Sequence, residues 1–253
     1  MTHPHHLPMR ELYVSEAAAG ALRAEARKLP AWTLDAAQTG ELSLLLNGGF
    51  APLRGFMPEA DWRAARDGGD APWPVPLALR VGADFADRAR PGDDIALRDA
   101  GGEVLAVMSV TDRWGDPALL GGKVKGLRRP SGLGAPNDLR ALFRDRDTAR
   151  VLAIQPRRPD QVAPAARLAA RLDALLLVQP LPGVAVEPPA GAVLAPLPVM
   201  PPPGPRSVLW QGLVARNHGA THVVLDGDAA ARELYRCHQD GIGAQMVVPE
   251  GIL

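Results

Sequence analysis

"ARVLAIQPRRPDQVAPAARLAARLDALLLVQPL", residues 149–181, decides the fold of the second half of the chain. A short apolar run ends in the polar turn 155–161, a helix-forming segment follows over 163–170, and a second apolar run comes after it. Two buried-type strands joined by a helix predict parallel strands with a crossover connection. Proteins that handle nucleotides use such strand–turn–helix junctions to bind anions. This turn, however, contains no His, Lys, Ser or Gly.

The same alternation continues towards the C-terminus. The sequence predicts a helix over 204–219, a strand in "THVVLDG", a helix over 229–237 and a last strand in "AQMVVPE". A ligand would then bind beyond the carboxyl ends of the strands, near residues 155–158 and 226–228. The proline-dense segment 181–206 cannot hold a helix of any length, so it is either an extended linker or a loop packed across the sheet.

The first half of the chain predicts a different architecture. Ser15 is a candidate N-cap for a helix reaching residue 28, and Asp35 for a helix that Asn47, Gly48 and Gly49 can end. From residue 73 to 110, short strands alternate with turns, including a Gly-Gly hairpin, which indicates a small antiparallel, barrel-like unit. Residues 130–145 read as a connector leading into a short helix. We therefore expect an α+β unit followed by an α/β unit.

Composition limits the classes of function. Lys+Arg and Asp+Glu both number 28 among 253 residues, so nothing in the net charge indicates a nucleic-acid or anionic-membrane partner. The single cysteine, Cys237, cannot form an internal disulfide, which suits the cytoplasm. No signal pattern or membrane-length apolar run is present, so we expect a soluble cytoplasmic protein. His3, His5 and His6 favour a disordered terminus over a metal site.

Several motifs resemble, in order, those of the ATP sulfurylase (sulfate adenylyltransferase) family. They cover nearly the whole chain: "LNGGFAPLRGFM" (46–57), "LLGGKVKGLRRP" (119–130), "VLAIQPRRPDQVAP" (151–164), "GPRSVLWQGLVARNHGATHVVLDGDAA" (204–230) and "MVVPEGI" (246–252). The resemblance implies a β-rich PUA-like domain over 1–147. It implies a shortened Rossmann-like domain of the HUP/nucleotidyltransferase type over 148–253. The family converts MgATP and sulfate into adenosine 5′-phosphosulfate and pyrophosphate.

The resemblance also assigns site residues, position by position. The family holds sulfate on a Gln-Thr-Arg-Asn turn and the ATP phosphates on two histidines, and a Gly-Arg-Asp-His turn supports the nucleotide. Here Gln161 and Pro164 stand at the positions of the two histidines, and Pro201 at that of a further arginine. The resemblance implies no confident catalytic residue and no metal ligand. It implies anion binding by Gln155, Arg157 and Arg158, and nucleotide binding by Arg206 and Asp228.

Loss of charge-stabilising groups predicts impaired catalysis, since removing one such donor costs roughly 10²–10³ in rate. We expect a truncated homologue that serves sulfate activation as an anion- or nucleotide-binding or scaffold partner. Its partner would be an adenylylsulfate kinase, another sulfate-activation subunit or a second copy of the chain. The alternative is an active sulfate adenylyltransferase that uses MgATP in a rearranged site.

Purely structural interpretations of the same residues stay open. Arg157 and Arg158 are alternatively solvated surface arginines, and Arg206 is alternatively part of a structural salt bridge. Asp226 and Asp228 could hold magnesium, but two acidic residues after a strand are also ordinary turn chemistry. His222, which precedes an apolar strand, favours a packed structural role.

Overall fold

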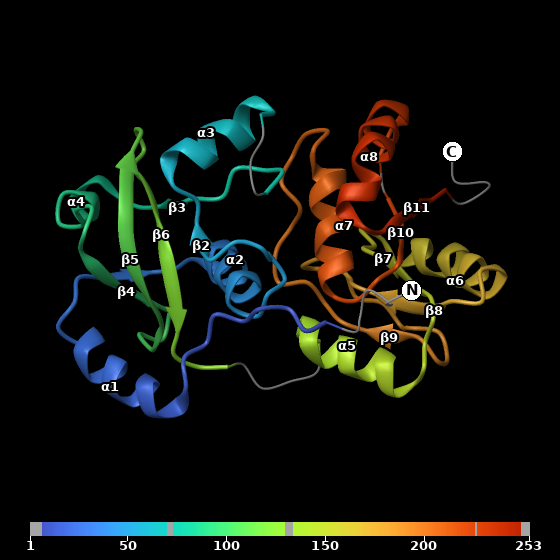
Figure 1. Ribbon diagram of the computed structural model, residues 1–253, viewed down its shortest axis with the longest axis horizontal. Helices are drawn as coiled ribbons and strands as arrows, with labels where there is room; N and C mark the ends of the chain where they lie inside the picture. The colour runs from blue at the N-terminus through green and yellow to red at the C-terminus, as the bar shows by residue number, and fades with distance from the viewer. Residues whose placement is uncertain (1–6, 70–72, 130–133, 226, 249–253) are drawn as a thin grey trace. The chain divides into compact units, whose positions relative to one another are not determined.

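The computed structural model describes residues 7–69, 73–129, 134–225 and 227–248 (Figure 1). His3, His5, His6 and Asp226 lie outside these ranges. The chain forms two compact units, one of Arg10–Ser131 and one of Met1–Met9 with Gly132–Leu253. We call them the N-terminal unit and the C-terminal unit.

The N-terminal unit is built on one six-stranded sheet. Its order is β1-β4-β5-β6-β2, with β3 also paired to β6. All pairs are antiparallel except β1 with β4, which the sequence did not indicate. The elements are α1 (Glu16–Ala26), β1 (Ala31–Thr33), α2 (Ala36–Leu46), β2 (Gly55–Phe56), α3 (Glu59–Asp67), β3 (Leu79–Arg80), α4 (Ala83–Ala86), β4 (Asp94–Arg98), β5 (Val104–Trp114) and β6 (Leu119–Gly126).

Local chemistry explains where these helices begin and end. Asp35 accepts a hydrogen bond from the backbone N–H of Gln38 at 2.8 Å, while Gln38 Oε1 accepts one from the backbone N–H of Asp35 at 3.2 Å, so α2 starts in a capping box. Ser15 caps α1 as predicted. Gly55 is required sterically, because a Cβ there would lie 2.1 Å from the carbonyl oxygen of Gly122 on β6.

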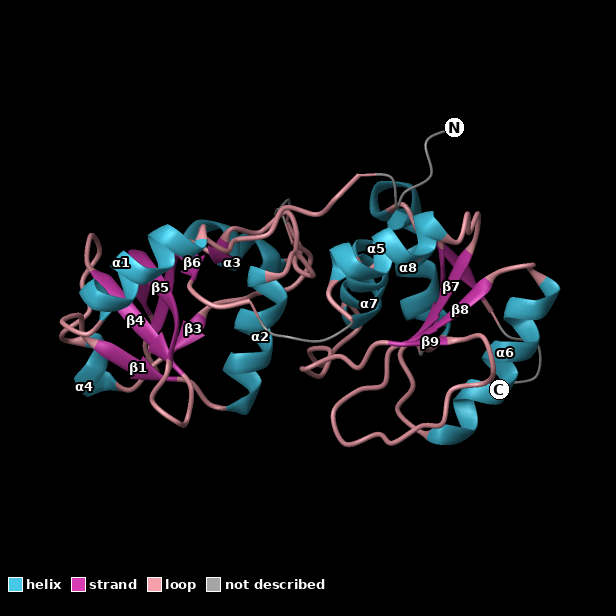
Figure 2. Cartoon of the chain, turned by 90° about the horizontal axis from the view of Figure 1, so that it is seen from below, coloured by secondary structure: helices cyan, strands magenta, loops and turns pink. Residues whose placement is uncertain are grey.

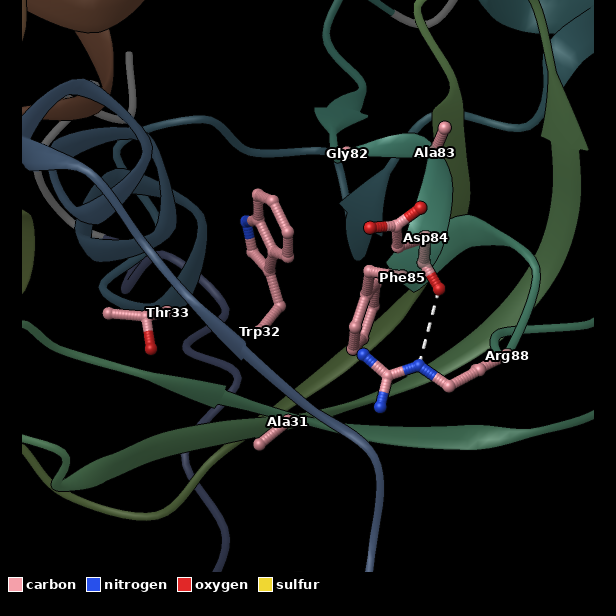
Figure 3. A pocket seen from close by; sticks show the side chains of 8 residues that line it. All are labelled: Ala31, Trp32, Thr33, Gly82, Ala83, Asp84, Phe85 and Arg88. Carbon is pink, nitrogen blue, oxygen red and sulfur yellow. Dashed lines mark hydrogen bonds between the residues drawn. The ribbon is translucent and has the colours of Figure 1, made fainter.

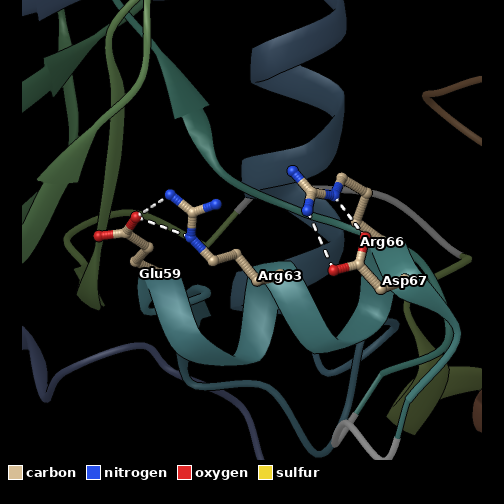
Figure 4. Close-up of polar contacts among 4 residues, drawn as sticks. All are labelled: Glu59, Arg63, Arg66 and Asp67. Carbon is tan, nitrogen blue, oxygen red and sulfur yellow. Dashed lines mark hydrogen bonds and ion pairs between the residues drawn. The ribbon is translucent and has the colours of Figure 1, made fainter.

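The solvent face of α3 carries ion pairs along its length. Glu59 pairs with Arg63 one turn later, and Arg66 pairs with Asp67 at 2.7 Å (Figure 4). Such exposed ion pairs contribute little to stability, because water and salt screen them. They support the helix but mark no functional site.

The C-terminal unit is a parallel α/β layer structure, as predicted. Its five strands have the order β11-β10-β7-β8-β9, and every pair is parallel. The elements are α5 (Pro136–Asp145), β7 (Val151–Ile154), the short 3₁₀ helix η1 (Pro159–Gln161), α6 (Val162–Arg171), β8 (Leu175–Val178), β9 (Val193–Leu194), α7 (Ser207–Asn217), β10 (His222–Val224), α8 (Ala229–Ile242) and β11 (Gln245–Val247).

Alternate residues of the strands bury opposite faces of this sheet. Val151 and Ala153 of β7 pack in one cluster with α5, α7 and α8, whereas Leu152 and Ile154 pack in another with α6. Figure 2 shows α6 on one side of the strands and the other three helices on the opposite side. With both faces covered, the strands are continuous apolar runs, as is usual in parallel sheets.

Helix α5 belongs to the C-terminal unit. Leu139 and Phe143 lie in the same core cluster as Val151 of β7, and both are buried. The two compact units therefore meet in sequence at residues 131 and 132, whereas the resemblance placed the domain boundary at 147.

The proline-dense segment is a packed loop rather than a linker. Its residues Val193 and Leu194 form β9 and pair with β8, which makes β9 an edge strand of the sheet. Leu181, Ala195 and Leu197 are buried around it. Proline tolerates such edge positions because no ladder hydrogen bond is lost there.

Candidate functional site

Five of the residues named from the sequence lie near the carboxyl edge of the parallel sheet, namely Gln155, Arg157, Arg158, Arg206 and Asp228. The chain runs from the central strand β7 outward through β8 to β9, then returns to β10 on the other side of β7. Ligands of open α/β sheets bind where the strand order reverses in this way. Gln155 follows β7 and Asp228 follows β10 at this point, and Arg206 immediately precedes α7.

The start of α7 lies against the turn that follows β10. A Cβ on Gly227 would be 3.1 Å from Cγ1 of Val208 and 3.0 Å from Cβ of Ala231, so the first turns of α7 and α8 pack around this glycine. Arg206 is therefore close to the turn that carries Asp228.

The turn after β7 satisfies its own backbone donors. Gln161 Oε1 accepts hydrogen bonds from the backbone N–H groups of Arg157 at 2.7 Å and of Arg158 at 3.1 Å. The guanidinium of Arg158 pairs with Asp160 at 3.2 Å. Both arginine side chains are exposed. Two N–H groups that could hold an anion are thus occupied by a side-chain amide of the same turn.

Gln155, at the start of this turn, is buried. Its side chain is only 5% exposed, and Nε2 donates to the backbone carbonyl of Gln211 at 3.2 Å and to Gln179 Oε1 at 3.4 Å. Sequence reasoning overlooked Gln179 and Gln211. A signal existed, because a Gln-Pro pair follows both strands, as Gln155-Pro156 after β7 and Gln179-Pro180 after β8.

Asp228 and Arg206, the two residues predicted to bind nucleotide, both make hydrogen bonds at the starts of helices. Asp228 is the N-cap of α8, where its Oδ1 accepts a hydrogen bond from the backbone N–H of Ala231 at 2.8 Å. This is the ordinary turn chemistry weighed for it above. Arg206 is half-buried at the start of α7, and its carbonyl accepts from the N–H of Leu209 at 3.0 Å.

The histidines of the sheet lie at its opposite, amino edge. His222 opens β10, and burial, aided by Arg150, lowers the pKa of its ring. His218 ends α7, is 2% exposed, and has its pKa lowered to about 4, chiefly by burial. Neither is placed to act at the carboxyl edge. The described residues also hold no cluster of three or more His, Cys, Asp or Glu that could bind a metal ion.

A separate hollow of about 700 Å³ lies in the N-terminal unit between β1 and α4. Trp32 and Phe85 form its aromatic wall, with ring centroids 5.2 Å apart, and Arg88 lies over Phe85 (Figure 3). It contains none of the residues predicted from the sequence. Nor does the described part of the chain contain a helix with the length and apolarity needed to cross a membrane.

Comparisons with known proteins agree with both units. Residues 2–118 match the model of a PUA-like domain, which confirms the β-rich domain expected in the first half. A sulfate adenylyltransferase of Symbiobacterium thermophilum is 30% identical over 81% of this chain and 67% of its own length. A probable bifunctional SAT/APS kinase of Sorangium cellulosum is 25% identical over 90% of this chain and 49% of its own length.

A solved structure extends the likeness to the fold of nearly the whole chain. The hexameric APS kinase from Thiobacillus denitrificans superposes with a TM-score of 0.83 at 29% identity, over 97% of this chain and 56% of that one. This chain thus spans between about half and two thirds of the length of these relatives.

Proposed function

Because the chain belongs to the sulfate adenylyltransferase family, we propose that it serves sulfate activation in the cytoplasm as an oxyanion- and nucleotide-binding protein with impaired adenylyl transfer. One observation carries the proposal. Gln161, which stands where the family has a histidine for the ATP phosphates, instead binds the backbone N–H groups of Arg157 and Arg158.

The chemistry requires preorganised donors to the ATP phosphates, and this chain has no histidine at the two positions where the family has them. Transfer of an adenylyl group develops negative charge on the leaving phosphates, and preorganised donors accelerate it by stabilising that charge. Gln161 is neutral and its amide oxygen faces the turn, while Pro164, in the first turn of α6, carries neither charge nor N–H. Neither residue supplies the positive charge that a protonated histidine would bring to the phosphates, which supports the proposal of impaired transfer.

Binding of an anion is still supported by the exposed guanidinium groups. Arg157 and Arg158 both reach solvent at the carboxyl edge, where sulfate or a nucleotide phosphate can approach them. Asp160 offsets part of that charge through its pair with Arg158. The nucleotide would arrive as MgATP, with its magnesium held by phosphates, since the described residues offer no ligand cluster for the ion.

An adenylylsulfate kinase is the partner that the relatives favour. One relative is a probable bifunctional SAT/APS kinase and the similar solved structure is a hexameric APS kinase. We therefore propose that the chain assembles with such a kinase or with further copies of itself.

Calorimetric titration with MgATP, sulfate and adenosine 5′-phosphosulfate, beside a pyrophosphate-release assay, tests the proposal. We expect binding of at least one anionic ligand, weakened by Arg157→Ala, without turnover at ordinary enzyme rates. Arg236→Ala is the matched control, because Arg236 is an exposed arginine of the same unit that pairs with Glu233 on α8. Fast turnover that Arg157→Ala abolishes would instead show an active sulfate adenylyltransferase with a rearranged site.

A further inference from the structure

Three buried glutamines, Gln155, Gln179 and Gln211, form a polar cluster beneath the turn after β7. We call it the three-glutamine cluster. The residues are 5%, 0% and 2% exposed and come from the ends of β7 and β8 and from the middle of α7. No charged group takes part in the hydrogen bonds that join them.

The orientation of two of these amides follows from the backbone. The carbonyl oxygen of Gln211 can only accept, so the Gln155 atom 3.2 Å from it must be Nε2. The same Nε2 lies 3.4 Å from Gln179, which must therefore present Oε1 to it. Flipping the Gln155 amide would bring two acceptors together, and flipping the Gln179 amide would bring two donors together.

This arrangement leaves one acceptor and two donors without a protein partner. They are Gln155 Oε1, Gln179 Nε2 and Gln211 Nε2, all sealed from solvent. Buried polar groups are almost always satisfied, because an unpaired one has lost its hydrogen bonds to water. A charged ligand fits poorly in this neutral, desolvated setting. A hydroxyl group fits well, since it has one donor and two acceptor lone pairs.

We propose that the three-glutamine cluster is a closed binding site for one uncharged hydroxyl group. The group donates to Gln155 Oε1 and accepts from Gln179 Nε2 and Gln211 Nε2. It belongs either to a resident water molecule or to a hydroxylated ligand whose anionic group is held by the arginines of the neighbouring turn. Only the second source rests on the proposed function.

Nuclear magnetic resonance on the wild-type chain, labelled with ¹⁵N-glutamine, tests for the water. We expect cross-peaks between the Nε2 protons of Gln179 and Gln211 and a long-lived water. A titration then compares glycerol 3-phosphate with propyl phosphate, which has the same charge but no hydroxyl groups. A ligand hydroxyl that enters the cluster makes glycerol 3-phosphate bind up to about tenfold tighter.

Gln179→Met removes the Nε2 donor at similar side-chain volume, so it should abolish the preference for glycerol 3-phosphate over propyl phosphate. The control variant Gln239→Met on α8 should keep that preference. Far-ultraviolet circular dichroism checks that each variant is folded. A water cross-peak or a hydroxyl preference supports the inference, and finding neither overturns it. If neither phosphate ester nor inorganic phosphate binds while the water cross-peak persists, the proposed function fails and the hydroxyl site stands.

Discussion

Gln161 Oε1 accepts hydrogen bonds from the backbone N–H groups of Arg157 and Arg158, as an oxygen of a bound anion would. Gln161→Ala should release both donors, and we expect sulfate and pyrophosphate to bind about three- to tenfold tighter by calorimetry. Gln239→Ala is a close control, because Gln239 Oε1 also accepts a backbone N–H, that of Met246 at 2.7 Å. Unchanged affinity in Gln161→Ala would show that the turn is no anion site.

His218 makes the C-terminal unit sensitive to acid. Burial lowers its pKa from the ordinary 6.5 to about 4, so the unfolded chain binds a proton between these values while the folded chain does not. Stability should therefore fall as pH drops from 6.5 to 4, by up to about 1.4 kcal/mol per pH unit. Urea unfolding followed by hydrogen exchange at the backbone amides of α7 measures this.

In His218→Gln that part of the pH dependence should disappear. His238→Gln is matched to it, because both histidine rings place Nδ1 near the carbonyl oxygen four residues earlier, at 2.7 and 2.8 Å, but His238 is exposed. An equal acid response in wild type and His218→Gln would contradict the assignment.

Glu41 has the opposite pH dependence in the N-terminal unit. Burial first, and the Asp35 carboxylate second, raise its pKa from 4.5 to about 7. The folded chain therefore keeps a proton that the unfolded chain loses, so stability falls as pH rises from 4.5 to 7. At pH 8, Glu41→Gln should gain on the order of 2 kcal/mol in thermal unfolding, and nothing at pH 4. The exposed Glu25→Gln should gain nothing at either pH.

Among the elements, the packing of α7 against α8 depends on a single glycine. A Cβ on Gly212 of α7 would lie 2.3 Å from the ring of Tyr235, which is fully buried on α8 and donates its hydroxyl to the carbonyl of Ala244 at 2.9 Å. Gly212→Ala should destabilise the C-terminal unit by about 1–3 kcal/mol through overpacking.

Gly241→Ala on α8 provides the contrast, because no atom lies within 4 Å of its added Cβ. There the substitution should stabilise by about 0.5–1 kcal/mol, since alanine is the better helix former. Denaturant titration measures both changes. A neutral Gly212→Ala would mean that the helices separate at little cost.

Most elements were predictable because their signals are local. Ser15 and Asp35 cap their helices as expected, and β7, α6 and β8 fall within the stretch that first indicated a parallel sheet. The sequence did not predict the short strand β9, because its two residues lie among prolines and become a strand only by pairing with β8. The sequence also predicted too short an α8, which continues to Ile242 because that residue is buried and Gly243 ends the helix in the left-handed conformation.

The candidate site was predictable in place but not in detail. Strand order brings Gln155, Arg206 and Asp228 to one edge, which follows from alternating strands and helices. The inward rotation of the Gln155 amide depends on Gln179 and on a carbonyl of α7, both distant in sequence. Such side-chain contacts arise only from tertiary packing, so no local pattern could reveal them.

At the scale of the whole molecule, the C-terminal unit is discontinuous in sequence. Asn137 on α5 holds the segment Leu7–Met9, accepting from the backbone N–H of Met9 at 2.7 Å and donating to its carbonyl at 3.0 Å. Asn137→Ala should lower the unfolding free energy of this unit by about 1–2 kcal/mol. Hydrogen exchange at the backbone amides of α7 during urea unfolding reports on that unit. As a control, Arg144→Ala at an exposed position of α5 should leave the unfolding free energy unchanged. Equal effects of Asn137→Ala and Arg144→Ala would refute the role of Asn137.

This discontinuity sets an order of events during synthesis on the ribosome. Met9 emerges first, yet its partner Asn137 follows 128 residues later, after the entire N-terminal unit has been made. The N-terminal unit can therefore fold as a continuous segment while the two pieces of the other unit are still apart. When Asn137 finally meets Met9, the ends of the loop to be closed are already held by a folded body, which reduces the conformational entropy that closure must overcome.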